Sequence, residues 1–237
     1  MIDNLVPEGS LADRLRSHCR ADWDAYVTHP FVRQLADGSL PEACFRHYLA
    51  QDYIFLMHFA RAYALAAYKS EDLTEMRQAA ASLDALANGE MALHISYCAG
   101  WGLSEADLWT MPEDPANMAY TRFVLERGLA GDLLDLLVAL APCVIGYGVI
   151  GRRLMADPAT KLSDNPYKPW IETYAGDDYQ ELAGNAVVQL DRVAAKRIGA
   201  APQESGRWPS LAASFAHATR LEIGFWDMGL APAKAAP

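Results

Sequence analysis

Apolar side chains recur at spacings of three and four residues along nearly the whole chain, whereas the two-residue alternation of a half-buried strand is almost absent. This periodicity gathers apolar residues on one helix face and predicts an all-α fold. Prolines at early helix positions and glycines at helix ends bound the segments consistently. The predicted helices cover residues 11–28, a short segment after Pro30, and then 41–69, 72–102, 116–128, 132–156, 166–175, 178–198 and 209–229.

The domain organisation follows from what separates these helices. The chain has 237 residues, which is enough for one large core. We find no linker rich in Gly, Ser or Pro between two halves, and no internal repeat. We therefore expect residues 1–237 to form a single-domain helical bundle, with a disordered tail at about 231–237.

The net charge excludes some classes of binding partner, and the cysteine content indicates the cellular compartment. The net charge of −10 and pI near 5.0 argue against nucleic acid and anionic membranes as partners, because both favour a basic surface. The uncharged stretch from Leu136 to Gly151 is shorter than the roughly 20 residues of a membrane-spanning helix, so we expect a buried core helix. The N-terminus lacks a basic segment followed by an apolar run, and the four cysteines form no C-x-x-C pair. We expect a cytoplasmic protein with free thiols.

One carboxylate stands in the middle of an aromatic helix face. Asp52 shares a stripe with Phe45, Tyr48, Phe55 and Phe59 at spacings of three and four. A carboxylate in such surroundings costs free energy unless a partner is present. It either pairs with an arginine or a backbone donor in the core, or it belongs to a binding site.

A second carboxylate has similar surroundings on the last predicted helix. Glu222 lies among large apolar residues that include Phe215, Phe225 and Trp226. A carboxyl surrounded by hydrocarbon is shifted towards its protonated form, which suits general acid–base catalysis. One such residue is more often structural than catalytic, but two in one small protein favour a functional site.

Cys143 lies on an unusual helical segment. It follows Pro142, which removes a helical hydrogen bond, and precedes glycines that leave space beside the backbone. Tyr147 lies one turn later on the same face. The other three cysteines are expected to be small buried apolar residues.

Two motifs are set aside. The glycines at 146, 148 and 151 match G-x-G-x-x-G, but a helical segment and not a strand precedes them, so we do not expect a dinucleotide site. Glu90 and His94 lie four residues apart, and no second such motif is present, so we do not expect the carboxylate–histidine metal centre of helical bundles.

Several segments together resemble the TenA/thiaminase II family. They are His29-Pro30-Phe31-Val32, Tyr48 to Tyr53, Asn165-Pro166-Tyr167 with Trp170 to Tyr174, and Glu222 to Trp226. Their order and separations are more specific than any one of them. The resemblance spans nearly the whole chain and implies the haem-oxygenase-like all-α fold.

The resemblance also implies roles for individual residues. It places the family's nucleophile on Cys143, its acid–base glutamate on Glu222 and its substrate-binding aspartate on Asp52, with no metal and no organic cofactor. A sister branch of the family lacks the cysteine, so this chain resembles the cysteine-containing branch. The implied aromatic residues of the substrate pocket are Phe55, Tyr120, Tyr147, Tyr174 and Phe225, where Phe55 replaces a common tyrosine and Tyr167 is a second candidate for the position of Tyr174.

The implied activity is hydrolysis of an aminopyrimidine or of thiamine in thiamine salvage, by a protein that the family suggests is a homotetramer. The alternatives are a non-hydrolytic protein of the same fold: an oxidase, or a ligand-binding or transcription-regulatory protein. The acidic composition argues against direct contact of such a regulator with DNA.

Overall fold

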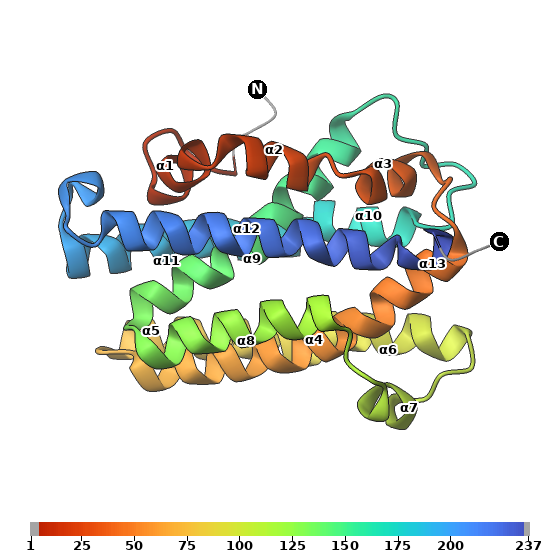
Figure 1. Cartoon of the computed structure of the whole chain (residues 1–237), viewed down its shortest axis with the longest axis horizontal. Coiled ribbons are helices and arrows are strands. Elements are labelled where there is room, and N and C mark those ends of the chain that lie inside the picture. The colour runs from red at the N-terminus through yellow and green to blue at the C-terminus, as the bar shows by residue number, and fades with distance from the viewer. Residues whose placement is uncertain (1–4, 235–237) are drawn as a thin grey trace. The chain divides into compact units, whose positions relative to one another are not determined.

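The computed structural model describes residues 5–234, and the described residues form helices without any β-strand (Figure 1). The all-α prediction is therefore confirmed. The α-helices are α1 (Leu11–His18), α2 (Arg20–Val27), α3 (Pro30–Asp37), α4 (Glu42–Lys69), α5 (Leu73–Asp84), α6 (Met91–Gly100), α7 (Glu105–Thr110), α8 (Pro115–Ala130), α9 (Leu133–Ala156), α10 (Lys168–Ala175), α11 (Asp177–Ile198), α12 (Trp208–Gly229) and α13 (Ala231–Lys234); a π-helix, η1 (Ala85–Glu90), joins α5 to α6, and a 3₁₀ turn, η2 (Pro202–Glu204), follows α11.

The chain divides into two compact units. Unit 1 consists of the residues up to Leu40 together with Leu137–Ile223, and unit 2 consists of Pro41–Leu136 together with the residues from Gly224 onward. The long helices α9 and α12 are each divided between the units. The sequence-based expectation of a single domain stays a prediction.

In unit 1, α1 packs on α2 and α11, and α10 packs on α11. Two glycines of α9 are required by close neighbours. A β-carbon on Gly146 would lie 2.3 Å from the ring of Tyr26, and one on Gly151 would lie 2.4 Å from the backbone of Tyr174. The glycine-rich sequence of α9 thus serves close helix packing.

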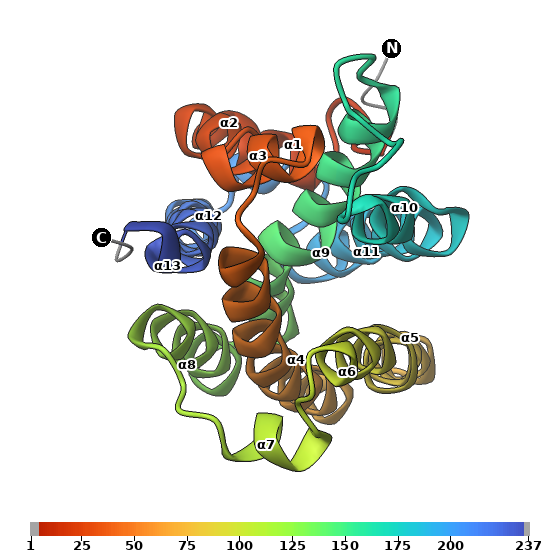
Figure 2. The same cartoon turned by 90° about the vertical axis from the view of Figure 1, so that its right-hand side faces the viewer.

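Unit 2 is centred on α4. Figure 2 shows α4 with α8 on one side and α5 and α6 on the other. The short helices α7 and α13 also pack on α4. The aromatic stripe of α4 is buried, as its spacing predicts, and this places Asp52 inside the unit.

Three segments differ from the prediction by more than a residue or two at their ends. The segment 11–28 is two helices because the backbone of Cys19 leaves helical geometry, with φ −118° and ψ 41°. The segment 72–102 contains the π-helix η1, which apolar periodicity does not reveal. An additional helix, α7, begins at Ser104, whose side chain and that of Asp107 form a capping box.

The C-terminal segment is a further difference. Residues 231–234 form α13, where the sequence suggested a disordered tail. The helix packs on α4, which provides the tertiary contact that a short helix needs. The rest of the predicted tail, 235–237, lies outside the described residues.

Helix α9 is long and apolar enough to span a membrane, with a mean hydropathy of 2.2 over its most apolar 18-residue window. However, 94 % of that window is buried inside the protein. Burial in the core accounts for its composition without a membrane. The helix continues through Pro142.

Candidate functional site

The buried carboxylate of Asp52 is the most distinctive polar feature of unit 2. The residue is 3 % exposed, one turn of α4 before Phe55. The sequence suggested an arginine or a backbone donor as its partner. The partner is instead His94 of α6, whose Nε2 lies 2.7 Å from Oδ2 of Asp52.

His94 is fully buried and held at both ring nitrogens. Its Nδ1 lies 2.8 Å from the carbonyl oxygen of Glu90. Burial lowers the pKa of His94, but the hydrogen bond and negative charge of Asp52, with Glu90, outweigh burial and raise that pKa above its ordinary value. The sequence suggested His94 only as a metal ligand together with the Glu90 side chain; in the structure its partners are the Asp52 carboxylate and the backbone carbonyl of Glu90.

Three of the expected pocket aromatics come together in unit 2. The ring centroid of Phe55 lies 5.0 Å from that of Tyr120 on α8 and 5.2 Å from that of Phe225 on α12. All three side chains are buried. Asp52 therefore lies one helical turn before Phe55, which forms an aromatic cluster with Tyr120 and Phe225.

Another set of expected residues lies in unit 1. Cys143 is half-buried on α9, whereas Cys19, Cys44 and Cys98 are buried. One turn after Cys143, the ring of Tyr147 lies 4.9 Å from that of Tyr174.

Tyr174 and its alternative Tyr167 differ in their surroundings. Tyr174 also contacts Trp170, with ring centroids 4.5 Å apart. The hydroxyl of Tyr167 instead donates a short hydrogen bond to the carbonyl of Leu40. The ring contact with Tyr147 supports Tyr174 as the pocket residue.

Glu222 is buried on α12 in unit 1, with an exposed fraction of 2 %. It lies three residues before Phe225, so the two side chains project from neighbouring positions of one helix. The residues expected to be functional thus form two sets. The set in unit 1 is Cys143, Tyr147, Tyr174 and Glu222, and the set in unit 2 is Asp52, Phe55, Tyr120 and Phe225.

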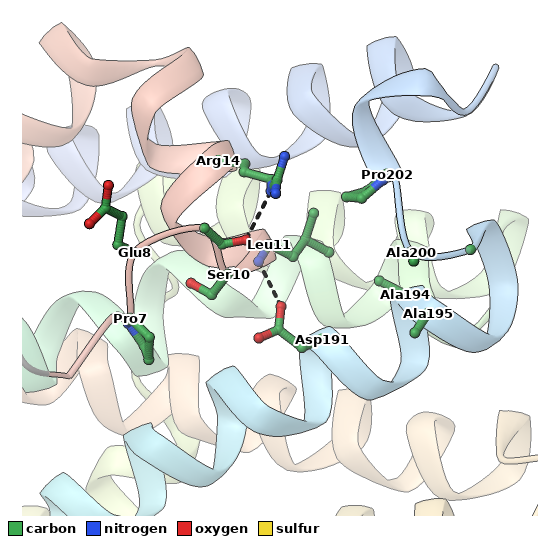
Figure 3. Close-up of a pocket in the computed structure, with 12 residues that line it drawn as sticks. Pro7, Glu8, Ser10, Leu11, Arg14, Asp191, Ala194, Ala195, Ala200 and Pro202 are labelled. Atoms are coloured by element: carbon green, nitrogen blue, oxygen red, sulfur yellow. Dashed lines mark hydrogen bonds between the residues drawn. The ribbon is translucent and has the colours of Figure 1, made fainter.

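Among residues 5–234, no group of three or more His, Cys, Asp or Glu side chains is arranged to hold a metal ion. A cavity of about 360 Å³ lies in unit 1, between α1 and the C-terminal end of α11 (Figure 3). Its lining includes Leu11, whose backbone N–H donates to Asp191 at 2.6 Å, and none of the expected site residues.

Comparisons with known proteins agree on one family. The TENA/THI-4/PQQC family matches residues 16–231. A Haemophilus influenzae protein named only as uncharacterized is 38 % identical over 93 % of this chain and 99 % of its own length. A Halalkalibacterium halodurans protein named aminopyrimidine aminohydrolase is 36 % identical over 92 % of this chain and 95 % of its own length.

Solved structures support the same relationship. A structure from Silicibacter sp. TM1040, described as a TenA family transcription regulator, is 50 % identical, with a TM-score of 0.89 over 92 % of this chain and 96 % of the other. A Shewanella denitrificans domain of unknown function with a heme oxygenase-like fold has a TM-score of 0.70 at 19 % identity, over 93 % and 92 % of the two chains, which confirms the expected fold. From the family match and these relatives, the chain belongs to the TENA/THI-4/PQQC family.

Proposed function

We propose that this protein is a hydrolase of thiamine metabolism that cleaves 4-amino-5-aminomethyl-2-methylpyrimidine to 4-amino-5-hydroxymethyl-2-methylpyrimidine, with thiamine as the second candidate substrate. The observation that carries the proposal is the buried Asp52 carboxylate on the helix face that continues into the aromatic cluster of Phe55, Tyr120 and Phe225. A flat amino-substituted heterocycle needs aromatic surfaces to stack on, at about 0.5–1.5 kcal/mol per pair, and a carboxylate that accepts from its amino group. A full-length relative with the name aminopyrimidine aminohydrolase supports this substrate class.

The proposed chemistry is covalent. The Cys143 thiolate adds to a carbon of the pyrimidine ring, and Glu222 gives a proton to a ring nitrogen to absorb the negative charge. The amine then leaves from the exocyclic methylene carbon with a proton. Water adds its hydroxyl to that carbon and supplies a proton that replaces the one carried off by the amine. The carbon–sulfur bond then breaks to return the thiolate, and the ring nitrogen returns its proton to Glu222. The half-burial of Cys143, in contrast to the other three cysteines, supports its role as the nucleophile.

The test is turnover of 4-amino-5-aminomethyl-2-methylpyrimidine, and of thiamine in parallel, by the wild-type protein and by Cys143→Ser. We expect wild-type turnover and a loss of several orders of magnitude in the variant, which should still bind the hydroxymethyl product. Full activity of Cys143→Ser would remove the nucleophile assignment, and an inactive wild-type protein would overturn the function.

A relative described as a transcription regulator suggests a cheap second measurement. We expect no gel shift of double-stranded DNA at moderate salt. A chain with a net charge of −10 repels the DNA phosphates unless its basic residues gather on one surface. A salt-sensitive shift at micromolar protein would contradict this expectation.

A further inference from the structure

The Asp52–His94 pair has a defined number of protons. A carbonyl oxygen only accepts hydrogen bonds, so the Nδ1 of His94, 2.8 Å from the Glu90 carbonyl, carries a proton. One further proton lies between Nε2 of His94 and Oδ2 of Asp52, which are 2.7 Å apart. If Nε2 holds it, the pair is an ion pair, and if Oδ2 holds it, the pair is neutral.

The other carboxylate oxygen of Asp52, Oδ1, has the same hydrogen-bonding role whether the pair is ionic or neutral. In either case the shared proton lies on the side of Asp52 that faces His94, so Oδ1 carries no proton and only accepts hydrogen bonds. Among the described residues of unit 2, His94 is the only hydrogen-bond partner of this carboxylate. Oδ1 is thus an acceptor whose role is fixed by a neighbour.

The backbone before His94 places the Glu90 carbonyl within hydrogen-bond distance of Nδ1. The π-helix η1 ends at Glu90, the residue whose carbonyl binds Nδ1, and α6 begins at the next residue. π-helical turns are rare and occur frequently at functional sites. The turn that precedes α6 therefore supplies the acceptor that fixes the tautomer of His94.

We propose that His94 is a positioning residue that restricts Asp52 to the acceptor role, so that the protein selects heterocycles with an amino group at this point and rejects their oxo counterparts. The inference rests on the proposed function, because it assumes that Asp52 meets the amino group of the pyrimidine. Without His94, a buried Asp52 holds or releases its proton according to the ligand, and it then accepts or donates equally well.

Two substitutions of His94 separate the two hydrogen bonds. The amide of His94→Gln takes the place of Nε2 and keeps a donor near Asp52. The amide of His94→Asn takes the place of Nδ1 and keeps the bond to Glu90 but does not reach Asp52. His47→Gln is a matched control, since His47 is a half-buried histidine of α4 that lies 4.0 Å from Asp114.

The measurement is calorimetric binding of 4-amino-5-hydroxymethyl-2-methylpyrimidine and of its 4-oxo counterpart to each folded protein. We expect a preference for the amino compound of at least about tenfold in wild type, His47→Gln and His94→Gln, because an unpaired buried polar group penalises the wrong ligand. In His94→Asn the ratio of the two affinities should fall to within about threefold. A purely structural role of His94 would lower stability and leave this ratio unchanged.

Asp52→Asn tests the same inference if His94→Asn does not fold. With Nδ1 still bound to the Glu90 carbonyl, a neutral His94 accepts at Nε2 from the amide N–H, and the amide oxygen remains for the ligand. The amino preference should therefore persist in Asp52→Asn. Its loss there, or its retention in His94→Asn, overturns the role of His94 while wild-type turnover leaves the proposed function intact. A wild-type protein that binds neither heterocycle overturns both.

Discussion

Gly151 of α9 lies directly against the backbone of Tyr174 in α10: a β-carbon at Gly151 would lie 2.4 Å from the Tyr174 carbonyl carbon and 2.5 Å from its oxygen. A backbone neighbour does not rotate away as a flexible side chain does. We therefore expect Gly151→Ala to displace α10, and with it the ring of Tyr174 that contacts Tyr147. Overpacking of this kind lowers the free energy of unfolding by about 1–3 kcal/mol.

The control for this substitution is Gly224→Ala. Gly224 also lies inside a long helix, α12, but a β-carbon there meets no atom within 4 Å. Alanine is the better helix former, so the free energy of unfolding of this variant should be about 0.5–1 kcal/mol higher than that of the wild type. Urea unfolding of the two variants measures the contrast. Equal stability of the two variants would show that α9 and α10 do not pack closely at Gly151.

The four thiols should react at different rates. Cys143 is half-buried, while the other three are buried. Burial raises the pKa of Cys98 to about 11, and it also raises the pKa of Cys19 against the opposing hydrogen bond from Thr219. Because the thiolate is the reactive form, a short treatment with iodoacetamide at pH 7.5 should label Cys143 first. Peptide mass spectrometry identifies the labelled residue, and earlier labelling of Cys98 would contradict the burial pattern.

Apolar periodicity predicted α4 and α9 to within a residue or two, because long amphipathic or uniformly apolar helices are determined by their own sequence. It did not predict the interruption at Cys19, where the apolar pattern continues although the backbone turns. The π-helix η1 was not predicted for a similar reason. A π-turn changes the hydrogen-bond register within a helix and has no marker in side-chain spacing.

The contact between His94 and Asp52 could not be predicted from the sequence either. The aromatic stripe showed that Asp52 needs a partner, but the identity of the partner depends on how α6 packs on α4, which lies 42 residues earlier at the point of contact. The useful signal was a carboxylate in an aromatic stripe that offers it no partner, together with a histidine whose surrounding helix is apolar. Combining the two would have made His94 a candidate.

Gln51, next to Asp52, should be important for stability. Its amide nitrogen donates to the Pro112 carbonyl at 3.0 Å, and its amide oxygen accepts from the backbone N–H of Asp114 at 2.8 Å. Gln51→Leu keeps the volume but leaves both backbone groups without this partner. We expect a loss of about 1–3 kcal/mol in the free energy of unfolding. Gln34→Leu, at a half-buried position of α3, is the control, and equal urea midpoints for the two variants would refute the role of Gln51.

Cys98 makes the stability depend on pH in a defined direction. Burial raises its pKa from 9.0 to about 11, so between these values the folded state holds a proton that the unfolded state has released. The stabilisation from the protonated thiol is complete below about pH 9 and is lost as the pH rises towards 11. Wild-type protein should therefore lose stability relative to Cys98→Ala between pH 8 and pH 10.5. Urea unfolding of both proteins across this range measures the difference, and a difference that stays constant would show that the Cys98 thiol ionises in the folded state as readily as in the unfolded chain.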